Sequence, residues 1–116
     1  MRMNAYVAGV GMTRFGKQLD KTLKGLAGEA IQLALADAGM DKSALQAAWM
    51  GNAAAGVVTG QEMIRGQVAL REMGIGKIPV INVENACASS STAFQQACAM
   101  VTAGLYDVVL ACGSEK

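Results

Sequence analysis

Residues 79–93, PVINVENACASSSTA, decide the fold of this chain because a strand pattern changes into a helix pattern within them. Pro79 opens a β-branched run that predicts a strand over 79–85, and a proline is tolerated at the first position of a strand. From Cys87 the side chains become small, and a helix is predicted from there to about Thr102. Cys87 therefore lies at the junction of a predicted strand and a predicted helix.

Further elements are predicted on both sides of this junction, from apolar runs and from apolar side chains at helical spacing. The predicted strands are Ala5–Gly11, Ala48–Ala53 and Asp107–Gly113. The predicted helices run from a candidate N-cap, Thr22, to a terminal Gly39, and over residues 60–74 with Gly74 at the end. Strands and helices alternate along the chain, which is typical of an α/β fold with a mostly parallel sheet.

Composition and charge exclude several classes of protein. The 116 residues are 53% hydrophobic and 16% charged, which is too apolar for a disordered chain. The formal net charge is +1 without a basic stripe, which argues against nucleic acid as a partner. No apolar run approaches the ~20 residues of a membrane span, and the N-terminus lacks a signal-peptide pattern. We expect a cytoplasmic protein, or one of an organellar matrix in a eukaryote.

The apolar composition also predicts that more protein covers this chain, because a small domain buries a smaller share of its surface than a large one. The covering protein would be further chain or another subunit. The sequence stops at GSEK, directly after the clearest strand pattern. We therefore expect residues 1–116 to be the N-terminal portion of something larger.

The three cysteines do not form a disulfide framework, since their number is odd and no CxxC pair is present. The chain has no histidine and no cluster of metal-ligand residues, so no metal site is expected. Cys98 would lie in mid-helix, about 16 Å along the axis from Cys87 and too far to pair with it. Cys112 falls within a predicted buried strand. Both Cys98 and Cys112 are interpreted as structural residues.

Cys87 has two interpretations. A helix N-terminus offers free N–H groups and the positive end of the helix dipole, and both favour the thiolate form of a cysteine. The same N–H groups can donate to an oxyanion on a substrate carbonyl, and the small residues 88–93 would let a substrate approach. A free cysteine is also among the most buried residue types, so Cys87 can instead be a small core side chain.

Several stretches together resemble the thiolase superfamily. NVENACASSSTAF (82–94) resembles its nucleophile motif, in which a cysteine opens a buried helix after the third strand. GLYDVVLACGSEK (104–116) resembles the following strand, and VAGVGMTRFGK (7–17) is similar to the sterol-carrier-protein-type and archaeal thiolases. The resemblance implies a layered α/β fold of two similar halves, each with a five-stranded mixed sheet. Residues 1–116 would be part of the N-terminal domain, without the loop domain and the C-terminal half.

The resemblance also implies a reaction, which is acyl transfer between a cysteine thiolate and coenzyme A. Cys87 would attack the 3-keto carbonyl of a 3-ketoacyl-CoA to give an acyl-enzyme, and free CoA would then take the acyl group. The reverse direction is a Claisen condensation. The backbone N–H of Cys87 would belong to the oxyanion hole. Acyl-CoA is then a substrate, and no tightly bound cofactor is implied.

The resemblance implies partners as well. Dimerisation in this family usually uses the strand that leads to the nucleophile, here Val80, Ile81, Asn82, Val83, Glu84 and Asn85. A homodimer or higher oligomer is therefore expected. The family's activating histidine, its second cysteine and an Asn-containing motif lie later in such chains. We expect these 116 residues alone to be inactive, as a truncated or proteolysed product or as one piece of a split enzyme.

Two alternatives remain open at this point. A thiolase-like aldolase would cleave the side chain of a hydroxyacyl-CoA by a retro-aldol reaction, and such relatives can dispense with the cysteine. A non-catalytic lipid-binding or scaffold subunit is the third possibility, because the family is linked to lipid-transfer proteins. The presence of Cys87 favours the thiolase reaction over the aldolase reaction.

Overall fold

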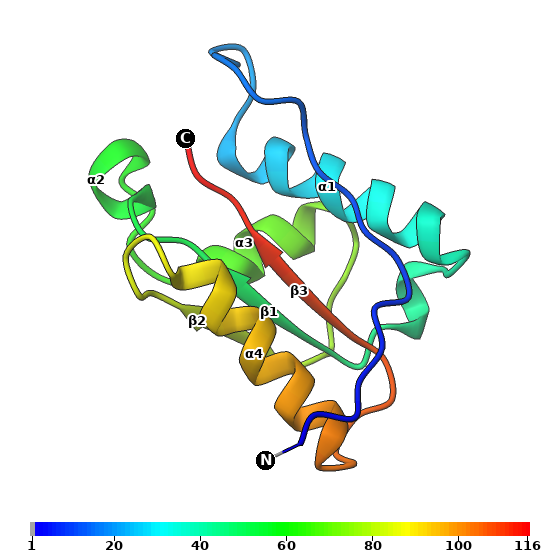
Figure 1. Ribbon diagram of the computed structural model, residues 1–116. Coiled ribbons are helices and arrows are strands. Elements are labelled where there is room, and N and C mark those ends of the chain that lie inside the picture. Colours follow the sequence, from blue (N-terminus) through cyan, green and yellow to red (C-terminus); the bar gives the residue numbers. More distant parts are fainter. Residues whose placement is uncertain (1) are drawn as a thin grey trace.

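The computed structural model describes residues 2–116 and contains one parallel sheet between two layers of helices (Figure 1). The sheet order is β2-β1-β3, with β1 at Ala47–Gly51, β2 at Val80–Val83 and β3 at Val109–Gly113. In the central strand, Ala48 pairs with Val80 on one side and with Leu110 on the other. The predicted α/β fold with a parallel sheet is confirmed.

Helices cover both faces of the sheet (Figure 1). They are α1 at Leu23–Ala38, α2 at Ala55–Thr59, α3 at Arg65–Glu72 and α4 at Ser89–Thr102, with a short 3₁₀ turn at Lys42–Ala44. Helices α1 and α3 pack together on one face, and α4 packs on the opposite face against all three strands. The chain therefore forms a three-layered α/β/α unit.

The side chains of β1 belong to two separate hydrophobic cores, because successive residues of a strand point to opposite faces of the sheet. Ala48 and Met50 belong to the core beneath α1 and α3, whereas Ala47 and Trp49 belong to the core beneath α4. All residues of β1 are buried, as expected for a parallel strand with helices on both faces. Small alanine side chains in β1 let both helical layers approach the sheet closely.

Helix α1 begins and ends where the sequence predicts. The Thr22 hydroxyl accepts the backbone N–H of Gly25 at 3.0 Å, which satisfies one free donor of the first turn. Gly39 ends the helix with φ of 65°, a left-handed conformation that glycine adopts without steric cost. Both signals act locally, which is why the sequence alone identifies them.

The predicted helix over residues 60–74 is shorter in the structure. Gly60 ends the short helix α2, which the sequence analysis did not predict, and α3 begins only at Arg65. The residue before α3, Ile64, has φ of 47°, which interrupts helical geometry at this point. The apolar pattern of the segment therefore continues across residues 60–64, where the helix is interrupted.

The predicted strand Ala5–Gly11 is not formed, and the segment crosses α1 without joining a ladder. The backbone N–H of Val10 donates to the Asp37 carboxylate of α1 at 2.9 Å. Gly9 and Gly11 lie so close to the α1 backbone that an added Cβ would clash with it. Contact with α1 thus replaces sheet pairing, and large apolar side chains of this segment remain exposed, Tyr6 by 92%.

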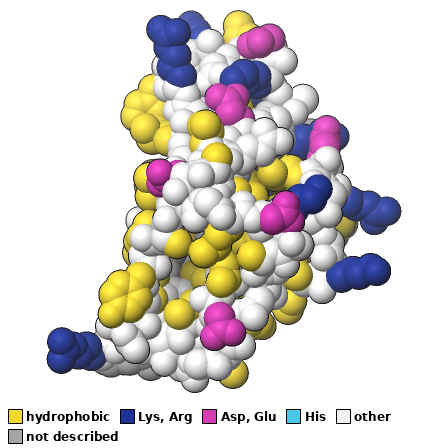
Figure 2. All heavy atoms as spheres, turned by 90° about the vertical axis from the view of Figure 1, so that its right-hand side faces the viewer, with side chains coloured by type: hydrophobic (Ala, Val, Ile, Leu, Met, Phe, Trp, Pro, Cys, Tyr) yellow, Lys and Arg dark blue, Asp and Glu magenta, His cyan; other side chains and the backbone are white. Residues whose placement is uncertain are grey.

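Figure 2 shows hydrophobic side chains gathered on the face that carries α1 and the N-terminal segment. Charged side chains lie around them. The exposed large hydrophobic residues of the N-terminal segment and α1 are Met3, Tyr6, Val7, Val10, Met12, Phe15, Leu19 and Leu33.

Candidate functional site

Cys87 lies on a turn between β2 and α4, at the carboxyl end of the sheet, and its free thiol is exposed. The sequence predicts a helix from Cys87, but α4 begins two residues later, at Ser89. Ala86, directly before Cys87, has φ of 46°, a left-handed conformation outside helical geometry. Within residues 2–116 Cys87 is exposed, which argues against the interpretation of Cys87 as a small core side chain.

The turn that carries Cys87 is fixed by hydrogen bonds on both sides of it. The Ala88 N–H donates to the Asn85 carbonyl at 2.9 Å, and the Ala86 N–H donates to the Glu84 carboxylate. Ser89 is buried, and its hydroxyl accepts the Asn85 N–H at 2.8 Å and donates to the Ala86 carbonyl at 2.7 Å. Side chains therefore hold a backbone conformation that a non-glycine residue disfavours.

The role of Ser89 in this turn was not predicted, because residues 88–93 were interpreted only by their small size, and Glu84 was predicted only as part of the dimer interface. One sequence signal could have found Ser89. A serine in the first helical turn commonly hydrogen-bonds backbone groups three or four residues earlier. Here the acceptor is Ala86 and the donor is Asn85, which are three and four residues before Ser89.

Two glycines at strand ends allow the start of α4 to reach the sheet. A Cβ on Gly51, the last residue of β1, would lie 2.8 Å from the N and Cα atoms of Ser90. A Cβ on Gly113, the last residue of β3, would meet the Ser90 side chain instead. The first turn of α4 therefore sits directly on the carboxyl ends of β1 and β3.

Backbone N–H groups near Cys87 are free. Within residues 2–116, the N–H groups of Cys87, Ser90 and Ser91 donate to no hydrogen-bond acceptor. Ala88 occupies the N-cap position of α4 and provides no side-chain cap. This arrangement leaves donors at the positive end of a helix, where a developing negative charge is stabilised.

The other two cysteines lie away from the turn. Cys98 is half-buried in the middle of α4, and Cys112 is partly buried in β3. Burial raises the pKa of the Cys112 thiol to about 11. At neutral pH such a thiol is almost entirely protonated and is a poor nucleophile.

The six residues predicted at a dimer interface lie on and just after β2, which is an edge strand. On the side that faces β1, the Pro79 carbonyl accepts the Ala48 N–H at 3.0 Å, and the Val83 carbonyl accepts the Asn52 N–H at 3.1 Å. Alternate residues of a parallel strand face opposite neighbours, so the backbone groups of Asn82 point away from β1. No strand pairs with that side within the described part of the chain.

The side chains of this predicted interface differ in exposure. Val83 is buried and Val80 and Ile81 are partly buried, whereas the polar residues Asn82, Glu84 and Asn85 are exposed. The Asn82 carboxamide accepts the Gly66 N–H at 2.6 Å and thereby fixes the start of α3.

A cavity of about 160 Å³ lies beside the Cys87 turn. It is lined by Met50, Asn52, Glu62, Ile64, Arg65, Asn82, Val83 and Glu84. Its wall is shared with the turn at Glu84, whose carboxylate accepts the Ala86 N–H. Asn52 is 2% exposed, and its carboxamide oxygen accepts Arg65 Nη1 at 2.9 Å, so a partly buried hydrogen bond fixes this wall.

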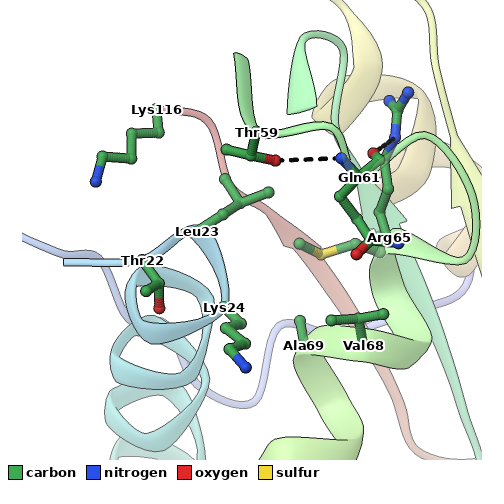
Figure 3. Close-up of a pocket in the computed structure, with 10 residues that line it drawn as sticks. Thr22, Leu23, Lys24, Thr59, Gln61, Arg65, Val68, Ala69 and Lys116 are labelled. Carbon is green, nitrogen blue, oxygen red and sulfur yellow. Dashed lines mark hydrogen bonds between the residues drawn. The ribbon is translucent and has the colours of Figure 1, made fainter. Parts of the chain in front are cut away.

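A second cavity, of about 320 Å³, lies between the starts of α1 and α3 (Figure 3). Figure 3 shows Thr22, Leu23 and Lys24 on one side and Val68 and Ala69 on the other.

The cationic side chains around this second cavity are engaged in other contacts. Lys24 pairs with Glu72 at 2.7 Å, Arg65 donates to Asn52, and Lys116 donates to backbone carbonyls ahead of α1. The charged groups of Lys24, Arg65 and Lys116 are therefore already paired within the protein, although these residues line the second cavity.

Two further properties concern metals and membranes. Among residues 2–116, no group of three or more Cys, Asp or Glu side chains lies close enough together to hold a metal ion. Within the same residues, every helix is too short or too polar to cross a bilayer.

Comparison with known proteins identifies relatives over nearly the whole chain. Sterol carrier protein 2 of Gallus gallus is 41% identical over 118 residues, which cover 100% of this chain and 21% of that protein. The acetyl-CoA acetyltransferase of Methanocaldococcus jannaschii is 39% identical, covering 95% of this chain and 28% of that protein. The benzoylsuccinyl-CoA thiolase subunit BbsB of Thauera aromatica is 36% identical, covering 100% of this chain and 29% of that protein. The chain therefore spans less than a third of each relative.

Solved structures show the same fold. The Ltp2-ChsH2(DUF35) aldolase superposes with a TM-score of 0.63 at 28% identity, over 85% of this chain and 24% of that chain. The 3-oxoacyl-(acyl-carrier-protein) synthase III of Aquifex aeolicus VF5 superposes with a TM-score of 0.62 at 15% identity, over 80% of this chain and 29% of that chain. At this level of identity the similarity is evidence of the fold alone. The family model for the thiolase N-terminal domain matches residues 5–116. The chain belongs to the thiolase family.

Proposed function

We propose that this chain supplies the nucleophilic cysteine of a thiolase-type acyl transfer to coenzyme A, with Cys87 as the acyl carrier. The observation that carries the proposal is the exposed Cys87 thiol on a constrained turn at the carboxyl end of the parallel sheet. Relatives named acetyl-CoA acetyltransferase and benzoylsuccinyl-CoA thiolase subunit support it. Acyl-CoA is the substrate in this proposal, and no tightly bound cofactor takes part.

In the degradative direction, the Cys87 thiolate forms a bond to the 3-keto carbon of a 3-ketoacyl-CoA. The bond between C2 and C3 then breaks, and its electron pair goes to C2 of the departing CoA thioester, which takes a proton. The thiol of free CoA then gives its proton to a base, its sulfur bonds to the acyl carbon, and the bond between that carbon and the Cys87 sulfur breaks, which regenerates the Cys87 thiolate. The free N–H of Cys87 is a candidate donor to the oxyanion of both additions.

The acid and base of these steps are proposed to come from residues beyond the 116 described by this sequence. The chain has no histidine, and Cys98 and Cys112 lie in a helix and a strand away from the turn. In this proposal the chain works as the N-terminal part of a larger enzyme, and the free edge of β2 joins a second copy to form a dimer. Pairing there would satisfy the outward backbone groups of β2.

The proposal is tested by locating the acyl group. The complete enzyme is incubated with acetoacetyl-CoA, quenched in acid and digested, and the acylated peptide is identified by mass spectrometry. We expect the acetyl group on Cys87, and we expect Cys87→Ser to lower kcat by at least about 10³-fold. Cys98→Ser is the matched control and should keep wild-type turnover. An acyl group on Cys98, or an active Cys87→Ser enzyme, would contradict the proposal.

A second measurement compares the three thiols by iodoacetamide labelling at pH 7. A thiol with a pKa of about 11, as burial gives Cys112, is only about 0.01% thiolate at this pH. Labelling of Cys112 should be very slow and should rise about tenfold per pH unit until the pH approaches that pKa. Cys87 should be labelled first. Equal rates at Cys87 and Cys98 would argue against an activated nucleophile.

Retro-aldol cleavage is the second candidate, favoured by the structural similarity to the Ltp2-ChsH2(DUF35) aldolase. In that reaction the bond between Cα and Cβ of a 3-hydroxyacyl-CoA breaks, giving a carbonyl compound and a CoA thioester, without an acyl-enzyme. A Cys87→Ser enzyme that still cleaves a 3-hydroxyacyl-CoA would favour the aldolase reaction. Loss of all turnover together with acetyl-Cys87 in the wild type would favour thiolysis.

A further inference from the structure

We infer that Ser89 is a positioning residue, whose hydroxyl holds the Cys87 thiol in its reactive orientation by fixing the left-handed turn at Ala86. This inference rests on the function proposed above, because it requires Cys87 to be the acyl carrier. It assigns a role to a buried side chain that does not itself touch substrate.

The Ser89 hydroxyl binds the turn at two points. Ser89 is 4% exposed, and its Oγ accepts the Asn85 N–H at 2.8 Å while donating to the Ala86 carbonyl at 2.7 Å. The Ala86 carbonyl also accepts the Ser89 N–H at 3.2 Å. One side chain therefore holds two peptide groups on either side of the turn, the one between Glu84 and Asn85 and the one between Ala86 and Cys87.

The turn requires such a clamp because Ala86 is held at φ of 46° without being glycine. An L-residue with a Cβ is disfavoured in this region, and it persists there only when surrounding contacts determine it. Cys87 follows directly and is exposed, so core packing does not set the direction of its side chain. Its orientation therefore depends on the backbone of the turn, which includes the left-handed Ala86.

The clamp is also anchored to the sheet. A Cβ on Gly51 would lie 2.9 Å from the carbonyl carbon of Ser89, so the backbone of Ser89 rests on the end of β1. The central strand, which pairs on both sides, is the most firmly held strand of the sheet. Ser89 therefore connects the end of β1 to the turn that carries Cys87, through its backbone on one side and its hydroxyl on the other.

The test measures acyl transfer by the complete enzyme with acetoacetyl-CoA and CoA. A misplacement of about 1 Å in a reacting group can cost on the order of 10²-fold, so Ser89→Ala should lower kcat by about 10- to 100-fold. Its KM should change less than about threefold, because Ser89 does not contact substrate. Gln95→Ala is the control on the same helix, since Gln95 is exposed and its side chain makes no hydrogen bond within residues 2–116. This control should behave like the wild type.

A rescue experiment separates positioning from simple loss of stability. Glycine adopts positive φ without the Cβ penalty, so Ala86→Gly added to Ser89→Ala should recover at least about threefold of the lost kcat. A variant that had only lost core stability would not regain kcat through this change. Should Ser89→Ala not fold, Ser89→Cys keeps a weak donor and acceptor of similar shape and is expected to give an intermediate kcat.

The outcomes distinguish this inference from the proposed function. A wild-type enzyme without acetyl-Cys87 would overturn the proposed function and the inference together. Acetyl-Cys87 in the wild type with unchanged kcat in Ser89→Ala would overturn the inference alone. A raised KM with unchanged kcat, or a double variant no better than Ser89→Ala, would overturn it as well.

Discussion

Helices α1 and α4 begin in opposite ways. The Thr22 hydroxyl caps α1 by accepting the Gly25 N–H, whereas Ala88 at the start of α4 has no side-chain acceptor. Replacing a threonine N-cap by alanine typically costs about 1 kcal/mol, so α4 starts with a less stable cap than α1 does. The turn before α4 also contains the left-handed Ala86. The helix that supports the sheet therefore has a side-chain cap, whereas the helix beside Cys87 has none and leaves N–H donors free for the reaction proposed at Cys87.

The largest expected effect in this comparison comes from Gly51→Ala. The new Cβ would lie 2.8 Å from backbone atoms of Ser90, which cannot rotate away, so α4 must shift from the sheet. Overpacking of this kind costs about 1–3 kcal/mol of unfolding free energy, measured by urea denaturation. Acylation of Cys87 should slow in parallel.

Gly113→Ala is the matched control for this change. Its Cβ would meet the Ser90 Oγ, which can rotate away, and would lie 2.9 Å from the Ser90 Cβ, so one close contact remains instead of the several that a Cβ on Gly51 makes with backbone atoms. We expect a smaller loss of unfolding free energy than for Gly51→Ala. Equal losses would show that the first turn of α4 does not depend on the end of β1.

Thr22→Ala should have a moderate effect confined to stability. Loss of the hydroxyl leaves the Gly25 N–H without its cap, which lowers the unfolding free energy by about 1 kcal/mol. The rate of Cys87 acylation should stay at the wild-type value, and Thr22→Ser should restore stability. A slower acylation rate in Thr22→Ala would contradict the distinction between the two helix starts.

The smallest expected effect comes from giving α4 the cap that it lacks. Ala88→Asp places a carboxylate beside free N–H groups and should raise the unfolding free energy by about 0.5 kcal/mol. The same carboxylate would occupy donors near Cys87, so acylation should slow. Ala88→Ser tests the cap without the charge. A faster Ala88→Asp enzyme would show that the missing cap has no part in the reaction.

Local signals explain what could be predicted from the sequence. The ends of α1 depend on Thr22 and Gly39, and the start of β2 depends on Pro79, so each is readable from a few neighbouring residues. The location of Cys87 at a strand-to-helix junction was predictable for the same reason. Its exposure was not, because it depends on the conformation of Ala86, and an alanine gives no warning of positive φ.

Tertiary contacts explain what could not be predicted. The apolar pattern of residues 5–11 is that of a strand, but its glycines bring it against α1, and pairing with the Asp37 carboxylate holds it there. Helix α2 is too short to show periodicity. The clamp formed by Ser89 depends on its burial against β1, which only the assembled sheet provides.

The sheet order has a consequence for synthesis on the ribosome. The central strand β1 obtains its partner β3 only when residues 62 positions further along have been made. At about 5–20 residues per second, that wait lasts about 3–12 s. Pairings so distant in sequence also fold slowly, because a long loop must close before the contacts form. β1 can pair with β2 once Val80–Val83 has been made, but until β3 follows, its other edge is open to chaperones or to neighbouring nascent chains.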